Sequence, residues 1–390
     1  ALPILSSQNY ELIFESVRGS DFLSDIALDD FLFDSSASCP QQKQCTFEQD
    51  TCGWQQDTTD DGLDWTRGTG ASYPTVPVDK STSTSNGNFI YVDTTTPHSD
   101  GDVARIISPV YNFSSSDYCE QFWYYHDGFG YIRLHSRENG VFSAPLWTSP
   151  VNTMRGWAYG SGTVSGNDVE VVFAGSVSSV YGSAMALDEI NIEFGACPPP
   201  GYCTFESLHC GWTNAVNDDF DWLLHSGATP SDSTGPPFDH TLGTIQGHYV
   251  YIETSNTATN ETARLVSEVF SATPTGCFTF WYHMFGADMG TLNIFLQELP
   301  SGPESLIWTL SGDQGDQWLL GQVDVTTGYE HIITFEAIDS SSFTGDISLD
   351  DINYLPRSCS SSPPTTTSVT PVTRQPSQWD CSFEGGSLCS

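Results

Sequence analysis

Residues 45–54 read Cys45-Thr-Phe-Glu-Gln-Asp-Thr-Cys-Gly-Trp54, and residues 203–212 read Cys203-Thr-Phe-Glu-Ser-Leu-His-Cys-Gly-Trp212. The two segments share the pattern Cys-Thr-Phe-Glu followed by Cys-Gly-Trp, at an offset of 158 residues. A shared segment at a fixed offset is the signature of an internal repeat. The chain is therefore interpreted as a series of repeated units.

Further landmarks keep this register. A Leu-Asp motif with a second acid occurs three times, in the segments 26–30, 185–189 and 347–351, and each copy precedes a cysteine. The repeat predicts five parts of the chain: the C-terminal part of a truncated domain at 1–39, a whole domain at 45–197, a second whole domain at 203–359, a Ser/Thr/Pro-rich linker at 360–380 and the start of a further domain at 381–390.

The apolar residues of each repeat are typical of strands. Short runs rich in aromatic and β-branched residues, such as 89–92, 249–252, 278–282 and 332–335, are separated by Gly, Asn, Asp, Ser and Pro. No long stretch has apolar residues at helical spacing. The sequence therefore predicts an all-β domain, most simply a sandwich.

Eleven cysteines make an odd number. Divided over the repeats they count one, four, four and two, and the single one is Cys39, whose partner we expect in the missing front of the first repeat. Four cysteines allow three pairings, so the sequence by itself leaves the connectivity of each whole repeat open.

The charge excludes some classes of partner. The formal net charge is −38, and Lys43 and Lys80 are the only lysines. Nucleic acids and anionic membranes require clustered Lys and Arg, so we expect neither as a partner. No run of about 18 apolar residues occurs, and no membrane insertion of this segment is expected.

Two sequons, at Asn112 and Asn260, predict N-glycosylation. Together with the paired cysteines they indicate an extracellular location, either of a secreted protein or of the ectodomain of a membrane protein. No nucleophile elbow, zinc-protease motif or phosphate loop is present, and the histidines lie in aromatic or turn contexts. We therefore expect no catalytic residues and no enzymatic activity.

In their order and spacing the motifs resemble the MAM domain, named for meprin, neuropilin and receptor tyrosine phosphatase mu. The resemblance rests on Cys-x-Phe-Glu, Cys-Gly-Trp, Asp-Trp, Phe-Trp-Tyr and the final Leu-Asp motif before a cysteine. It implies tandem jelly-roll β-sandwiches of two antiparallel sheets, stapled by disulfides. The implied bridges join the first cysteine to the second and the third to the fourth: Cys45–Cys52, Cys119–Cys197, Cys203–Cys210 and Cys277–Cys359.

Acidic residues break the strand alternation in 346–352. A strand of period two places Ile347, Leu349 and Asp351 on one face and Asp346, Ser348, Asp350 and Ile352 on the other, so either buried face carries a carboxylate. In a chain poor in cations, Ca²⁺ is a natural neutraliser. The candidate metal ligands are the acids that recur in both repeats: Glu48, Asp64, Asp79, Asp188, Glu206, Asp221, Asp239 and Asp350. Their alternative roles are backbone capping and solvated surface charge.

The resemblance implies a non-catalytic adhesion or matrix protein whose MAM domains contact other proteins, homophilically or heterophilically. One alternative is a lectin-like, carbohydrate-binding module. The tryptophans that follow the landmarks (Trp54, Trp65, Trp212 and Trp222) are expected in the core rather than on a glycan platform. Another alternative is that the repeats accompany a secreted protease or a cell-surface receptor.

Overall fold

A computed structural model describes residues 44–359 except for 59–60, 95–98, 114–115, 129, 151–155, 179–183, 207–209, 256, 259 and 341–343. The predicted partial domains at 1–39 and 381–390 and the linker at 360–380 lie outside the described residues. So does Cys39, with its unassigned partner.

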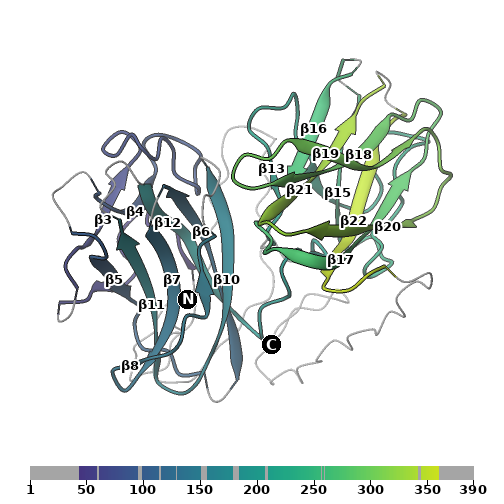
Figure 1. Cartoon of the computed structure of the whole chain (residues 1–390). Coiled ribbons are helices and arrows are strands. Elements are labelled where there is room, and N and C mark those ends of the chain that lie inside the picture. The colour runs from purple at the N-terminus through teal and green to yellow at the C-terminus, as the bar shows by residue number, and fades with distance from the viewer. Residues whose placement is uncertain are drawn as a thin grey trace, which may run out of the picture. The chain divides into compact units, whose positions relative to one another are not determined.

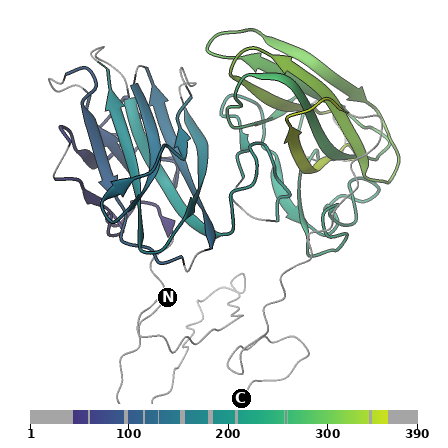
Figure 2. The same ribbon diagram turned by 60° about the horizontal axis from the view of Figure 1, so that its bottom comes forward.

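The described residues form two β-sandwiches, each with two antiparallel sheets (Figures 1 and 2). In the first sandwich, one sheet has the order β10 (Trp157–Ser165), β6 (Asp117–Asp127), β12 (Ala184–Phe194), β4 (Asn88–Val92) and β3 (Trp65–Thr69), and β1 (Gln44–Cys45) also pairs with β12. The other sheet has the order β2 (Gln55–Gln56), β5 (Val103–Ile107), β11 (Val169–Val177), β7 (Gly130–Glu138) and β8 (Val141–Phe142), and β9 (Trp147–Thr148) also pairs with β7.

The second sandwich repeats this arrangement. One sheet has the order β14 (Leu223–Ser226), β15 (His248–Tyr251), β22 (Ile347–Leu355), β17 (Thr273–Met284) and β20 (Leu319–Thr327). The other has the order β13 (Thr213–Asn214), β16 (Thr262–Val266), β21 (His331–Ile338), β18 (Thr291–Glu298) and β19 (Glu304–Ser311). The prediction of tandem all-β sandwiches is confirmed. Within the described ranges, no helix is long and apolar enough to cross a bilayer.

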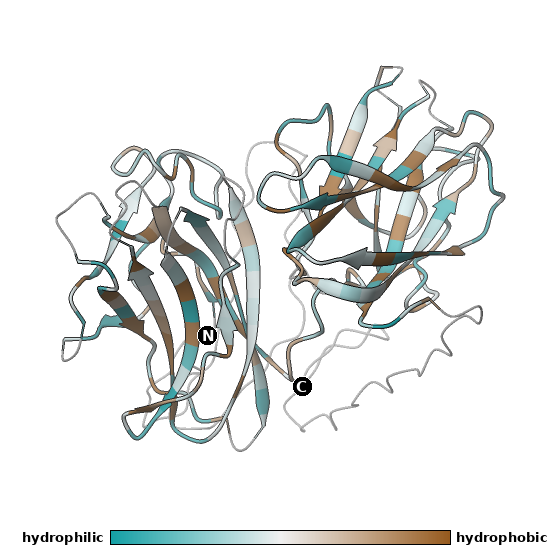
Figure 3. Cartoon of the chain, viewed as in Figure 1, coloured by the Kyte–Doolittle hydropathy of each residue, from teal (hydrophilic) through white to brown (hydrophobic). Residues whose placement is uncertain are grey.

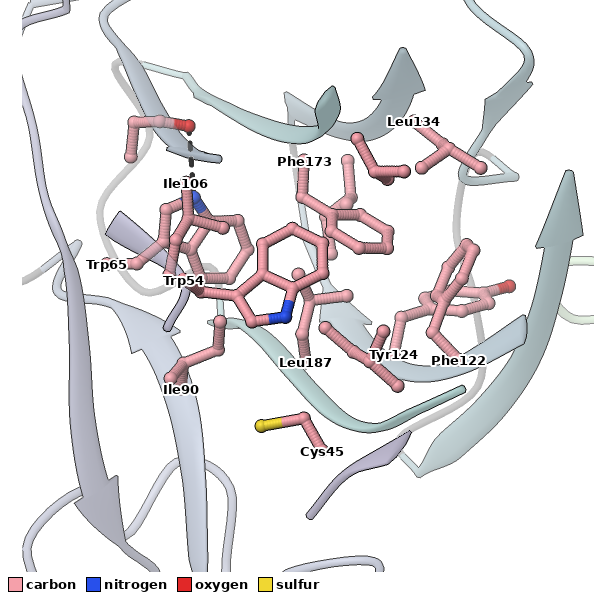
Figure 4. Close-up of a cluster of buried hydrophobic side chains, with 14 of the residues drawn as sticks. Cys45, Trp54, Trp65, Ile90, Ile106, Phe122, Tyr124, Leu134, Phe173 and Leu187 are labelled. Carbon is pink, nitrogen blue, oxygen red and sulfur yellow. Dashed lines mark hydrogen bonds between the residues drawn. The ribbon is translucent and has the colours of Figure 1, made fainter. Parts of the chain in front are cut away.

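Each sandwich has its own core between its two sheets, and apolar and polar residues alternate along many strands (Figure 3). Trp54 and Trp65 lie in the first core (Figure 4), and Trp212 and Trp222 lie in the second. All four are at most 7% exposed, which confirms that they are core residues. The indole N–H of Trp65 donates to the carbonyl of Ala104 at 3.1 Å, so its polar atom is satisfied inside the core.

Four disulfides staple the two sandwiches. Two short bridges, Cys45–Cys52 and Cys203–Cys210, fix the entry into each domain. The bridges Cys119–Cys197 and Cys277–Cys359 span 78 and 82 residues and tie β6 and β17 to the segments that follow β12 and β22. Closing such long loops removes more entropy from the unfolded chain than closing the short ones.

Candidate functional site

A β-bulge interrupts the last long strand of each sandwich. The pairing register of β12 shifts after Asp188 and that of β22 shifts after Asp350. The next residues, Glu189 and Asp351, have φ angles of 48° and 44°. A bulge inserts one extra residue and re-aims the side chains that follow it.

The bulge changes the faces that strict alternation predicts. Ile352 lies in the core with Ile347 and Leu349, instead of sharing a face with Asp350. The prediction for Ile352 was wrong because a period-two pattern does not include an inserted residue. Asp350 remains on the opposite face and is completely buried there.

The buried carboxylate before each bulge holds a loop. Asp350 accepts the backbone N–H groups of His240 and Thr241 at 2.8 and 3.1 Å. In the first sandwich, Asp188 accepts those of Lys80 and Ser81 at 2.8 and 3.2 Å. A buried carboxylate needs such donors, because burying it without them costs several kcal/mol.

Residues 79–88 and 239–248, here called the clamped loops, are also held from within. Asp79 accepts the N–H of Thr84 at 2.9 Å, and Asp239 accepts that of Thr244 at the same distance. Gly247 lies against this carboxylate so closely that a Cβ atom there would be 2.1 Å from the carboxylate carbon of Asp239. Each clamped loop is therefore folded around its own aspartate.

A glutamate completes each clamp. Glu48 accepts the N–H of Asn88 at 2.7 Å, and Glu206 accepts the N–H of His248 at 2.6 Å. Three of the four predicted acids in each repeat thus meet at one loop. The fourth predicted acid of each repeat, Asp64 or Asp221, does not lie at this loop. Asp64 is exposed near Asp61, and Asp221 is exposed near Asp218.

Burial is the main influence on the charge of the clamping aspartates. It raises the pKa of Asp188 to about 7. It raises the pKa of Asp350 to about 8, with the charge of Asp351 adding to the effect. Positive charge close to these groups would favour their ionised forms. Across the described ranges, no three His, Cys, Asp or Glu residues are arranged as a metal-ligand group.

Lys80 and His240 stand at the start of the clamped loops and cover tryptophans of β6 and β17. The ammonium nitrogen of Lys80 is 3.8 Å from the ring centroid of Trp123. The imidazole of His240 stacks on Trp281 and forms a hydrogen bond with the carboxylate of Asp351. Neither pair was predicted from the sequence, although each loop residue directly follows the aspartate that recurs in both repeats.

Glu120 is a second feature that was not predicted from the sequence. Its side chain in β6 is 1% exposed, and neither carboxylate oxygen has a hydrogen-bond partner. Burial raises its pKa well above the usual value. The equivalent residue in the second repeat is Phe278, a core residue 158 positions later. Glu120 thus places a carboxyl group at a position suited to an aromatic ring.

The two sequon asparagines, Asn112 and Asn260, are exposed. The amide nitrogen of Asn112 donates to Asp168 at 3.0 Å, so the local loop holds this side chain at the surface. Exposure is what a glycosylation acceptor requires, and glycosylation at these two positions stays a prediction.

Known proteins share the repeat of this chain, and they differ from it in length. The family described as "MAM domain, meprin/A5/mu" matches residues 45–198 and 203–360. "MAM domain-containing protein 2" of Homo sapiens is 31% identical over 376 residues, which are 90% of this chain and 53% of that protein. "Neuropilin-1a" of Danio rerio is 35% identical over 167 residues, 42% of this chain and 17% of that protein. The chain spans about half the length of the first of these relatives.

One solved structure, "Structure of the N-terminal CBM22-1-CBM22-2 tandem domain from Paenibacillus barcinonensis Xyn10C", covers 80% of this chain, and 96% of that structure is matched. Its sequence identity is 13% and its TM-score is 0.29. A likeness of this size carries no conclusion about function.

Proposed function

Because the chain belongs to the MAM domain family, we propose that it is a non-catalytic extracellular protein whose tandem MAM domains make adhesive or matrix contacts with other proteins. The observation that carries this proposal is the match of the family to both sandwiches, residues 45–198 and 203–360. The disulfides support the extracellular location, since such bonds persist in oxidising compartments.

The structure gives less support to a carbohydrate-binding role. Stacking on sugars needs an exposed aromatic platform, and the tryptophans considered for it are core residues. Protein contacts are therefore the preferred proposal. An accessory role beside a protease or receptor domain is compatible with it, because such a domain would recruit its partners through the same sandwiches.

Stabilisation by Ca²⁺ is a further part of the proposal. The ligands would come from the acids of the two clamps: Glu48, Asp79 and Asp188 in the first sandwich and Glu206, Asp239 and Asp350 in the second. An ionised carboxylate has about four acceptor sites. Asp188 and Asp350 each accept four hydrogen bonds, whereas Asp79 accepts three, Asp239 two, and Glu48 and Glu206 one each, so capacity for a hard cation remains on the loop aspartates and the glutamates. Ca²⁺ bound there would favour the ionised form of the buried aspartates.

The proposal is tested with the purified, disulfide-bonded chain. Sedimentation over a wide concentration range measures self-association, and binding of the labelled chain to cell surfaces and to deposited matrix measures contacts with other proteins. We expect saturable binding that is lost after reduction and alkylation of the disulfides. A chain that stays monomeric and binds neither surface nor matrix would overturn the proposal.

A further inference from the structure

The outer face of β5, β11 and β7 in the first sandwich carries arginines in a chain that is otherwise strongly acidic. Arg105 and Arg133 flank Ala174 in the strand register, all three pointing away from the core. Arg137 lies on the same face and pairs with Glu170 at 2.7 Å. In the row Arg105–Ala174–Arg133, two arginines therefore stand on strands about 10 Å apart, with one small residue between them.

The second sandwich has the same row with a different charge. There Arg264, Glu336 and Asn293 occupy the three positions. Glu336 lies 3.4 Å from Arg264 and accepts a hydrogen bond from Asn293 at 3.2 Å. Glu304 binds the same arginine at 2.7 Å. In the second sandwich, the carboxylate of Glu336 neutralises the arginine of the row. In the first sandwich, Ala174 stands at the same position and has no carboxylate.

Arg133 is the residue that this difference leaves without a counter-ion. Its guanidinium carbon lies 3.7 Å from the ring centroid of Tyr131, and its Nε atom has no hydrogen-bond partner. In the part of the chain that the structure describes, no carboxylate lies within ion-pair distance of Arg133. The other two arginines have carboxylates nearby. Asp61 lies close to Arg105. Asp57 and Glu170 lie close to Arg137.

Apolar side chains adjoin the arginines. Phe142 is 40% exposed, and the guanidinium carbons of Arg105 and Arg137 lie 5.5 and 5.8 Å from its ring centroid. Val141, beside it, is 72% exposed. A hollow of about 200 Å³, open to solvent, lies next to Arg137, and its lining includes Gln55, Gln56, Asp57 and Glu170. Arginine and aromatic residues together are typical of the centre of protein interfaces.

We propose that this face of the first sandwich binds an acidic peptide segment of a partner protein, with a carboxylate of that segment taking the place between Arg105 and Arg133 that Glu336 takes in the second sandwich. Arginine suits this role because its planar fork binds a carboxylate through two hydrogen bonds. Phe142 and Val141 contact apolar side chains beside the carboxylate. This inference rests on the proposed function and names the kind of partner.

Binding is measured on the full chain by the fluorescence anisotropy of a labelled oligo-glutamate peptide containing phenylalanine, at about 0.15 M salt. Arg133→Gln weakens binding about tenfold or more, the scale of a charged hydrogen bond. Ala174→Glu, which supplies the carboxylate of the second sandwich, abolishes it. Arg264→Gln is the matched control and leaves binding unchanged. Thermal unfolding checks that each variant is folded.

Three results would overturn the inference. One is equal peptide binding by wild type and Arg133→Gln. Another is tighter binding of heparin than of the peptide at the same residues, which would assign the face to a sulfated polysaccharide. The last is cell-surface or matrix binding of the chain that Arg133→Gln leaves unchanged, and this result would leave the proposed function standing.

Discussion

Lys80 and His240 occupy equivalent positions in the two sandwiches, and each lies on the face of a tryptophan. The ammonium nitrogen of Lys80 is 3.8 Å from the centroid of Trp123, and the ring centroids of His240 and Trp281 are 3.7 Å apart with planes inclined by 18°. One sandwich thus uses a cation and the other an aromatic ring to seat the first turn of its clamped loop.

Burial lowers the pKa of Lys80, and we expect its contact with Trp123 to stabilise the charged form. Lys80→Met keeps an apolar stem over Trp123 but removes the cation, and we expect a loss of about 1 kcal/mol in the free energy of unfolding, typical of a partly desolvated cation–π contact. Denaturant unfolding followed by tryptophan fluorescence measures it. Lys80→Arg retains the cation and should stay close to wild type. An equal loss of unfolding free energy in both variants would show that the charge of Lys80 does not contribute to the contact.

Glu120 makes the first sandwich sensitive to pH. Its folded pKa is raised above that of the unfolded chain, so its contribution to stability is greatest below about pH 4.3 and is lost as the pH rises through the folded pKa. Glu120→Gln should therefore flatten the fall of the unfolding free energy with rising pH. The comparison is made by calorimetry of the full chain from acidic to neutral pH.

The matched variant Glu120→Phe installs the residue of the second repeat. It should stabilise the first sandwich by about 1–3 kcal/mol at neutral pH, because it removes a buried polar group without partners. Parallel pH profiles for wild type and Glu120→Gln would contradict the assignment of a raised pKa to this carboxyl.

The clamped loop of the second sandwich depends on the absence of a side chain at residue 247. Gly247→Ala places a methyl group on the carboxylate of Asp239, and we expect a loss of about 2 kcal/mol from overpacking. Gly328→Ala is the control, because a Cβ there would meet nothing within 4 Å and the backbone needs no left-handed conformation. Similar melting temperatures for the two variants would argue against a tight clamp.

Ca²⁺ is expected to raise the unfolding temperature of both sandwiches. The chain is dialysed against EDTA and melted with and without millimolar Ca²⁺; a midpoint that rises with the Ca²⁺ concentration is the signature of binding to the folded state. Asp239→Asn should abolish the rise for the second sandwich, because Asp239 accepts only two hydrogen bonds and keeps oxygen sites for the ion, and Asp221→Asn, away from the clamp, should not. Identical midpoints without bound metal would leave the acids with backbone capping as their role.

The residues of the clamp could be predicted from the sequence only in part. Glu206, Asp239 and Asp350 could be selected because they recur at fixed positions, and the structure brings all three to one loop. Asp221 recurs equally well but lies elsewhere, because recurrence reports that a position is constrained and does not report what it touches. The backbone N–H groups that Asp350 binds belong to a loop about 110 residues before it, a pairing that no local pattern encodes.

By itself, the sequence determined the repeat, the all-β class and the family, since these depend on spacing, residue type and alternation along the chain. Tertiary structure alone decided three further features: the bulge that sends Ile352 into the core, the burial of Glu120 without a hydrogen-bond partner, and the absence of an ion-pair partner for Arg133 among the described residues. Each of them depends on which strands are neighbours and in what register. Register is set by the packing of whole sheets, so a residue's partner across the sheet is fixed only when the sandwich closes.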